Sequence, residues 1–189
     1  DKTLVAWVSP ANLTQQGGSV LTLENSAAEF DAIVLGELVP GKWMAGSDFF
    51  RRTEKEQTDW PVETAGPDSI VQIAIVYKGR QVTLYRDGKP YARYTMQGDP
   101  KVFAEDTAVV IGLRHLDARG DRYFAGSIDD ARVYDAALDA ATLAALKPNG
   151  MGDPEPLAWW SFESGRAEDH MKTFPDVYLS GGAALENGR

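Results

Sequence analysis

The fold expected for this chain is decided by residues 70–96, I-V-Q-I-A-I-V-Y-K-G-R-Q-V-T-L-Y-R-D-G-K-P-Y-A-R-Y-T-M. Two runs in this stretch place an apolar residue at every second position, which is the period of a half-buried strand: Val71, Ile73, Ile75 and Tyr77, then Val82, Leu84 and Tyr91. The segment Lys78-Gly79-Arg80 ends the first run, and Asp87-Gly88 ends the second. Asp-Gly suits a tight hairpin turn because both positions must tolerate a positive φ. The stretch therefore predicts three antiparallel strands in a meander, which is typical of a β-sandwich or barrel.

The rest of the chain adds strands and one helix. Strand patterns are expected at 3–9, 18–24, 30–36, 107–113, 123–134 and 157–163. Ala and Leu, the strongest helix formers, predict a short helix near 138–147, with Asp139 as its N-cap and Pro148 beyond its end. Residues 37–69 show no clear periodicity, and a loop that long in a small domain is often functional.

Composition narrows the class of protein. A chain of 189 residues with 43% hydrophobic residues suits one folded domain. No apolar run approaches the roughly 18 residues of a membrane span. The formal net charge of −9 disfavours nucleic acid and anionic membrane surfaces as partners. Because the chain has no cysteine, disulfides and thiolate metal sites are excluded.

Three motifs in one order carry a family resemblance. They are A-W-V-S-P at 6–10, I-A-I-V-Y-K-G-R-Q-V-T-L-Y-R-D-G-K-P-Y at 73–91, and F-A-G-S-I-D-D-A-R-V-Y-D-A-A-L-D-A-A-T-L-A-A-L at 124–146. Together they resemble the laminin G-like, concanavalin A-like jelly-roll family over roughly residues 3–147. The resemblance implies an all-β fold, an antiparallel two-sheet β-sandwich. It also implies a lectin-like or adhesion module, of the kind often attached to secreted bacterial glycoside hydrolases.

One departure from the family pattern concerns the order of the elements. The family's opening strand has its counterpart here in L-A-W-W-S-F-E-S-G at 157–165, followed by L-S-G-G-A at 179–183. We expect residues 1–149 to form the sandwich and residues 150–189 to form a tail that supplies a completing strand. Leu157–Phe162 should then pair antiparallel with Ile128–Tyr134. The alternative is that the tail begins a second, truncated module.

Catalytic residues are not found. Retaining glycosidases need two carboxyl groups about 5.5 Å apart, and Glu29-Phe30-Asp31 supplies only the first half of such a motif. Glu163 and Glu168 lie too far apart in a turn-rich segment to repeat it. No G-x-S-x-G nucleophile motif is present. The sequence therefore predicts a non-catalytic domain.

The loop at 43–60 is the candidate ligand-binding segment. Sugar sites combine flat aromatic rings with planar hydrogen-bonding groups, and a second loop at 114–123 could converge on the first. The candidate ligand-binding residues are Phe49, Phe50, Arg51, Arg52, Gln57, Trp60, Arg114 and His115. In the competing interpretation, Trp43 lies in the core and one of Phe49 and Phe50 packs inward. Arg51 and Arg52 then form ion pairs with nearby acidic residues. For Trp60 the two interpretations are evenly balanced.

Calcium is the one candidate cofactor. Asp129 follows a glycine turn and could be a calcium ligand, or its carboxylate could instead hold the turn through hydrogen bonds. For function, the resemblance favours a carbohydrate-binding module that takes a polysaccharide or oligosaccharide. It would be covalently linked to a catalytic domain and placed outside a bacterial cell or in its periplasm. The alternatives are a structural or protein-interaction domain that packs against a neighbouring enzyme domain, and an enzyme whose site is not recognised.

Overall fold

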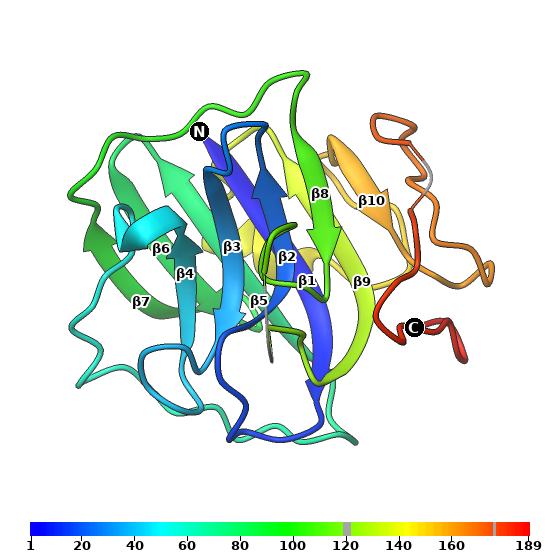
Figure 1. The fold of residues 1–189 in the computed structure, drawn as a ribbon, viewed down its shortest axis with the longest axis horizontal. Helices are drawn as coiled ribbons and strands as arrows, with labels where there is room; N and C mark the ends of the chain where they lie inside the picture. The colour runs from blue at the N-terminus through cyan, green and yellow to red at the C-terminus, as the bar shows by residue number, and fades with distance from the viewer. Residues whose placement is uncertain (119–121, 176) are drawn as a thin grey trace.

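Two antiparallel sheets stack face to face in the computed structural model, which describes residues 1–118, 122–175 and 177–189 (Figure 1). The six-stranded sheet has the order β10-β9-β1-β5-β6-β7, and the four-stranded sheet has the order β4-β3-β2-β8. The strands are β1 (Lys2–Pro10), β2 (Gly18–Glu24), β3 (Phe30–Leu35), β4 (Trp43–Ser47), β5 (Val71–Lys78), β6 (Gln81–Arg86), β7 (Lys89–Thr95), β8 (Ala108–Ile111), β9 (Gly126–Tyr134) and β10 (Ala158–Trp160). The predicted all-β sandwich is confirmed.

The central meander forms as its sequence predicts. β5 pairs antiparallel with β6, and β6 pairs with β7. The turn between β6 and β7 has positive φ at both Asp87 (51°) and Gly88 (69°), as a primed hairpin turn requires. A Cβ atom at Gly88 would lie 2.6 Å from the Cα of Ala144, so the turn also needs glycine for close packing.

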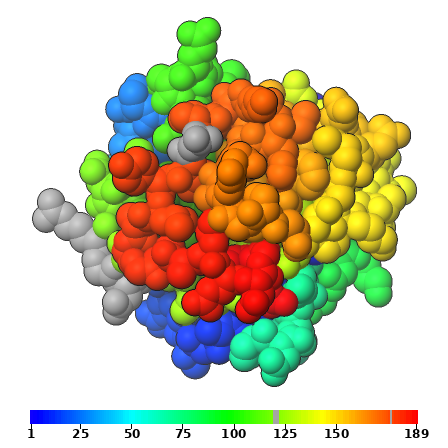
Figure 2. All heavy atoms as spheres, turned by 90° about the vertical axis from the view of Figure 1, so that its right-hand side faces the viewer, coloured from blue at the N-terminus to red at the C-terminus, as the bar shows by residue number. Residues whose placement is uncertain are grey.

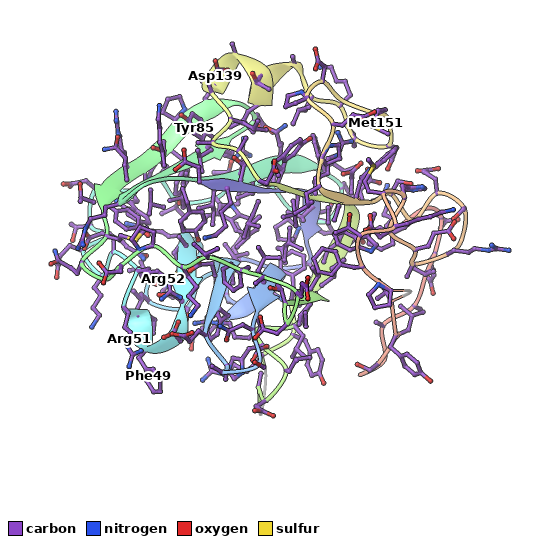
Figure 3. All side chains as sticks on the ribbon, turned by 90° about the horizontal axis from the view of Figure 1, so that it is seen from above. Phe49, Arg51, Arg52, Tyr85, Asp139 and Met151 are labelled. Carbon is purple, nitrogen blue, oxygen red and sulfur yellow. The ribbon has the colours of Figure 1, made fainter. Side chains whose placement is uncertain are left out.

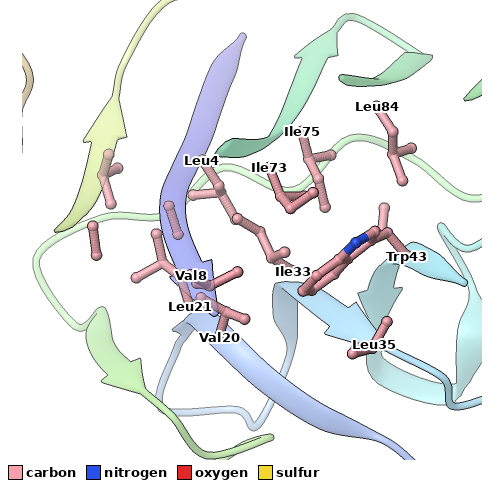
Figure 4. Close-up of a cluster of buried hydrophobic side chains, with 14 of the residues drawn as sticks. Leu4, Val8, Val20, Leu21, Ile33, Leu35, Trp43, Ile73, Ile75 and Leu84 are labelled. Carbon is pink, nitrogen blue, oxygen red and sulfur yellow. The ribbon is translucent and has the colours of Figure 1, made fainter. Parts of the chain in front are cut away.

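The main core lies between the two sheets (Figure 4). Leu4, Ile73, Ile75 and Leu84 reach in from the six-stranded sheet and meet Leu21, Ile33, Leu35 and Trp43 from the four-stranded sheet. All eight side chains are fully buried. Burying one such side chain contributes about 1.5–3 kcal/mol, so this interlayer contact is the main stabilising feature of the fold. The core role expected for Trp43 is confirmed.

A short helix covers the outer face of the six-stranded sheet (Figure 3). α1 (Ala140–Ala145) is capped by Asp139, whose carboxylate accepts a hydrogen bond from the Thr142 N–H at 2.8 Å. The helix is shorter than the predicted 138–147 because Leu146 has an extended ψ of 142°. Leu143 and Leu146 pack against Trp7 in a second buried cluster. Within the described residues, no helix has the length and apolar character needed to cross a bilayer.

The 37–69 segment contains a strand that the sequence pattern does not predict. β4 is buried on both faces, so W-M-A-G-S shows no alternation of apolar and polar residues. Trp43 and Ala45 face the core, whereas Met44 joins a separate cluster on the outer face of the four-stranded sheet. A strand that is covered on both faces does not alternate between apolar and polar residues, and that alternation is the pattern from which a strand is predicted.

The tail pairs with the sandwich at its edge. β10 is antiparallel to β9, with Ala158 opposite Val133 and Trp160 opposite Ala131. The predicted pairing of this segment is confirmed over Ala158–Trp160. Trp160 enters the main core, and its neighbour Trp159 lies on the other face of the sheet. Figure 2 shows the tail, coloured orange to red, covering this side of the molecule.

Candidate functional site

Two loops converge on the outer face of the four-stranded sheet. Phe30, Ala32, Val34 and Met44 form a buried cluster there, and Phe50, Trp60 and Leu38 pack against it. From the second loop, the His115 ring stacks on Phe30 at a centroid distance of 5.2 Å. The predicted convergence is thus found for the described part of the 114–123 loop; residues 119–121 lie outside the described residues.

The turn after β4 carries two phenylalanines in a strained backbone. η1 (Asp48–Phe50) contains Phe49 at φ 49° and Phe50 at φ 57°, both in the left-handed region. For a bulky L-residue this region costs roughly 1–2 kcal/mol. Phe50 is half-buried against the outer-face cluster, whereas Phe49 is 83% exposed. One ring packs and one is presented to solvent, as the sequence predicts.

A buried arginine holds this turn in place. The Arg52 Nε donates to Asp31 Oδ1 at 2.7 Å, and its Nη2 donates to Asp48 Oδ1 at 2.6 Å and to the Phe30 carbonyl at 2.8 Å. Burial alone would lower the pKa of Arg52, but Asp31 and Asp48 outweigh this effect and raise it. The guanidinium therefore stays charged and ties the turn to the interior.

Four more hydrogen bonds constrain the same backbone. The Arg52 N–H donates to Ser47 Oγ at 3.0 Å, and the Thr53 hydroxyl donates to the Ala45 carbonyl at 2.7 Å. From the neighbouring segment, the Gly98 N–H donates to the Arg51 carbonyl at 2.9 Å, and the Tyr94 hydroxyl donates to the Arg52 carbonyl at 2.8 Å. A strained conformation persists only when its surroundings over-determine it, and these bonds meet that condition.

The exposed side of the turn combines aromatic rings with cations. The guanidinium carbon of Arg51 lies 5.2 Å from the centroid of the Phe49 ring, and the Lys55 Nζ lies 5.7 Å from that of Phe50. Figure 3 shows Phe49 and Arg51 pointing away from the body of the domain, with Arg52 turned inward. We call Phe49, Phe50, Arg51 and Lys55 the Phe49 platform. It offers an apolar ring face beside groups that donate hydrogen bonds.

Three of the predicted ligand-binding residues are buried, which corrects the prediction. Arg52 is buried beneath the turn, where its Nε donates to Asp31. Gln57 is buried with its Nε2 donating to the Glu54 carbonyl at 3.1 Å. Arg114 is buried, pairs with Glu37 and lies 5.3 Å from the Phe30 ring centroid. These side chains are buried among partners within the domain, so they do not face a ligand approaching from solvent.

Trp60 and His115 are half-buried and support the site from behind. Trp60 stacks on Tyr94 at a centroid distance of 6.1 Å and meets Tyr91 edge-on at 6.2 Å. His115 lies on Phe30, and the next residue's N–H donates to the buried Glu24 carboxylate at 2.7 Å. Both rings therefore pack against the body of the domain, and each keeps only part of its surface in contact with solvent.

A second arginine site, which the sequence pattern does not reveal, joins the tail to the sheet. Arg132 donates two hydrogen bonds of 2.8 Å to Asp130 and lies between the rings of Trp7 and Trp159, at 4.8 and 5.2 Å. The Trp159 indole N–H donates to the same carboxylate at 2.9 Å. We call Trp7, Asp130, Arg132 and Trp159 the tail junction. All four side chains are buried.

Asp129 has protein partners of its own. Its Oδ2 accepts a hydrogen bond from the Asn149 side chain at 3.0 Å, and Arg189 Nε lies 3.9 Å from its Oδ1. Burial is the main cause that raises the pKa of Asp129. Across residues 1–118, 122–175 and 177–189, no group of three or more His, Asp or Glu side chains is placed to hold a metal ion. The surroundings of Asp129 therefore lack the carboxylate cluster that a calcium site draws on.

Glu29 and Asp31 lie in different environments. Glu29 is partly exposed and pairs with Lys101, and its Oε2 also accepts a hydrogen bond from Asn25. Asp31 is fully buried, where it pairs with Lys2 and Arg52. The half-motif seen in the sequence thus separates into one surface carboxylate and one interior carboxylate.

Solved structures of similar fold include several carbohydrate-related proteins. Domain 4 of AbnA, a GH43 extracellular arabinanase from Geobacillus stearothermophilus solved with arabinotriose, is 20% identical with a TM-score of 0.58, and the match covers 76% of this chain and 64% of that one. A candidate carbohydrate-binding protein from Bacteroides ovatus is 13% identical with a TM-score of 0.61, and the match covers 98% of this chain and 55% of that one. A heptameric SAP-like pentraxin from Limulus polyphemus is 14% identical with a TM-score of 0.52, covering 79% and 70%. At these identities the likeness shows a shared fold.

This chain spans 64% and 55% of the lengths of the first two structures above, so it corresponds to part of each. A comparison with curated protein sequences finds no match.

The sequence also matches a family model. The model for the Laminin G 3 family, described as the concanavalin A-like lectin/glucanases superfamily, matches residues 1–144. That match covers most of the chain and includes both sheets except β10. The chain therefore belongs to the concanavalin A-like lectin/glucanases superfamily.

Proposed function

We propose that this chain is a non-catalytic carbohydrate-binding module and that the Phe49 platform contacts the sugar. One observation carries the proposal: a strained, firmly anchored turn holds Phe49 with 83% of its surface in solvent. A folded chain gains nothing in stability from exposing a large ring on a costly backbone. Strain that is kept at an exposed site points to a role in binding.

The chemistry of the platform suits a sugar. A pyranose or furanose ring has an apolar C–H face and a rim of hydroxyl groups. The Phe49 ring can stack on that face, and Arg51 and Lys55 can donate hydrogen bonds to the rim. Because Arg52 fixes the backbone beneath, the turn is ordered before the ligand arrives, which reduces the entropy cost of binding.

The similar structures support the same class of ligand and a modular setting. The arabinanase domain was solved with arabinotriose and is one domain of an extracellular glycoside hydrolase. We propose that this chain likewise belongs to a larger secreted glycoside hydrolase of bacterial origin. It would hold a covalently linked catalytic domain near polysaccharide in the extracellular or periplasmic space.

Affinity electrophoresis against a panel of soluble polysaccharides tests the proposal. We expect at least one polysaccharide to retard the protein, and we expect Phe49→Ala to abolish the retardation without unfolding the domain. Tyr178→Ala is the matched control, since Tyr178 is an aromatic residue on the tail that is even more exposed (96%) than Phe49. If no polysaccharide retards the protein, or if Phe49→Ala migrates like the parent, the proposal fails.

A protein-interaction role has one observation in its favour. The tail exposes Tyr178 and Leu179 beside a hollow that is also lined by Val177 and Leu185. Exposed apolar groups that gather at a hollow can mark a contact with another protein. We would test this by expressing the neighbouring catalytic domain separately and measuring its association with this chain. Leu179→Ser should weaken that association, and Phe49→Ala should leave it unchanged.

A further inference from the structure

A chain of ion pairs runs from the interior to the Phe49 platform. Lys2 pairs with Asp31 at 2.9 Å, and Asp31 pairs with Arg52 at 2.7 Å. Arg52 pairs with Asp48 at 2.6 Å, and Asp48 lies 3.4 Å from Arg51. Cations and carboxylates alternate, so three cations share two carboxylates. The three positive charges exceed the two negative charges, so this series of ion pairs has one excess positive charge.

The excess charge lies at the exposed end. Asp31, Asp48 and Arg52 are buried, and Lys2 is nearly so, whereas the Arg51 side chain is 59% exposed. Asp48 is held more tightly by Arg52 than by Arg51, as the distances of 2.6 and 3.4 Å show. Arg51 is thus the cation whose charge is least neutralised, and it lies against the ring of Phe49.

Lys55 adds a second exposed cation to the platform. No ion pair among the described residues includes Lys55. Glu54 and Glu56 flank it in sequence, and the Glu56 N–H donates a hydrogen bond to Glu54 Oε1 at 3.0 Å. The Lys55 ammonium instead lies over the ring of Phe50, 5.7 Å from its centroid.

We infer that the sugar held by the Phe49 platform carries an anionic group, either a carboxylate or a sulfate. The inference rests on the proposed function of the platform. The planar guanidinium of Arg51 can bind two oxygens of such a group side by side, which a neutral hydroxyl cannot match. The same sugar residue can stack its C–H face on Phe49, because the guanidinium and the ring lie next to each other.

The net charge of −9 acts against the approach of a polyanion, but it does so from a distance. At physiological ionic strength of about 0.15 M, exposed charges more than about 8 Å apart are largely screened. The charges nearest the ligand then decide the preference, and Arg51 and Lys55 are the two exposed cations beside the rings of the platform. The preference for an anionic sugar is therefore to be measured at that ionic strength.

Matched ligand pairs test the inference. The probes are oligogalacturonate against its methyl ester, and a sulfated galactan against its desulfated form, each titrated calorimetrically. We expect the anionic member of at least one pair to bind tenfold or more tightly than its neutral partner. Arg51→Gln and Lys55→Gln should each reduce that ratio severalfold. Lys78→Gln removes the same charge at the exposed last residue of β5 and should leave the ratio unchanged.

The outcomes separate this inference from the proposed function. A preference within the galacturonate pair alone, or within the galactan pair alone, supports the inference and identifies the anionic group. Equal or tighter binding of the neutral members, lost in Phe49→Ala, overturns the inference and leaves the carbohydrate-binding role in place. A preference reduced equally by Lys78→Gln also overturns it, because net charge would then be the cause. No binding of any probe or polysaccharide to the parent protein would reject both.

Discussion

The Phe49 platform and the tail junction use the same kinds of residue for different ends. Each has a buried arginine bonded to a buried carboxylate. Arg52 bonds to Asp31 beneath the turn that carries Phe49 and Phe50, and Arg132 bonds to Asp130 between the rings of Trp7 and Trp159. At the tail junction both rings are buried. At the platform one ring is 83% exposed.

The difference lies in what each arginine stabilises. Arg132 lies between the rings of Trp7 and Trp159 and joins β9 to β10. Its contacts are therefore all made within the fold. Arg52 lies beneath a turn and holds a strained backbone that presents a ring outward. Composition alone does not separate a structural arginine cluster from a binding site, whereas the exposure of the neighbouring ring does. Substitutions at the two arginines and at Phe49 test that distinction.

The largest expected effect is the loss of either buried arginine. Removing one partner of a buried ion pair leaves an uncompensated charge and costs about 3–5 kcal/mol. We expect Arg132→Ala and Arg52→Ala each to lower the free energy of unfolding by that amount in urea denaturation. Folded Arg132→Ala should keep its sugar affinity, because the tail junction is closed to ligand. Folded Arg52→Ala should lose affinity, because Phe49 is no longer held outward.

This comparison fails if the two variants bind sugar equally well. Equal binding would show that the anchoring of the turn does not matter to the ligand. The matched exposed control is Arg80→Ala, since Arg80 pairs with Asp99 at the surface. Its unfolding free energy should change by no more than about 1 kcal/mol.

The next effect concerns the tail. We propose that residues 150–189 are an integral part of the sandwich, because Trp160 is buried in the main core. Trp160→Ala should lower the unfolding free energy by about 3 kcal/mol, the lower end for a buried tryptophan, because an edge strand can partly relax into the space. Thermal unfolding should remain a single transition. Two separate transitions, with the first 149 residues unaffected, would instead favour a second module.

Acid should weaken the fold through a buried carboxylate away from both arginine sites. Burial would raise the pKa of Glu63, but hydrogen bonds from Arg86, the Ala65 and Thr64 N–H groups and the Trp43 indole outweigh it and lower the pKa to about 2. A depressed folded-state pKa gives stability that is present above the usual value of 4.5 and is lost as pH falls toward 2. We expect a loss of about 2–3 kcal/mol over that range, allowing for the partial exposure of Arg86.

The Glu63→Gln variant isolates this contribution. It should be less stable than the parent at neutral pH and should show a flatter fall in unfolding free energy between about pH 5 and pH 2. The pH dependence, followed by urea denaturation at each pH, would count against this assignment if parent and variant gave parallel curves.

The smallest expected effect on stability is at Phe49 itself. Glycine adopts a positive φ without strain, so Phe49→Gly should leave the domain equally stable or stabilise it by up to about 1 kcal/mol. The same change should abolish sugar binding. A gain or no change in stability together with a loss of function marks a residue kept for binding. A clear destabilisation in thermal unfolding would mean that the ring supports the fold.

Local signals in the sequence predict the fold well. Asp87-Gly88 gives the hairpin, Asp139 gives the helix N-cap, and alternation gives β5 and β6, because each depends on residues close in the chain. The outward placement of one phenylalanine at 49–50 also follows from adjacency. β4 is not predicted, because both of its faces are covered and its residues therefore show no alternation of apolar and polar side chains.

The buried arginines are the part that local patterns do not predict. Arg52 is bonded to Asp31 and to the Phe30 carbonyl, about twenty residues earlier, and Arg114 pairs with Glu37 across the sheet. In sequence each looks like a surface cation in a polar loop. The fold brings Asp31 to Arg52 and Glu37 to Arg114, so these two predicted ligand-binding residues are in fact interior. The residues that remain exposed are those for which the turn offers no internal partner or only a weak one.

The most direct test maps the bound sugar onto the domain. Backbone amide NMR shifts would be recorded during titration with the polysaccharide fragment that binds best. Our account predicts that the largest shifts cluster at residues 48–55 and that the Trp159 and Arg132 amides do not move. Shifts centred on the tail hollow at 165–168 and 177–185, with the 48–55 amides unchanged, would contradict it.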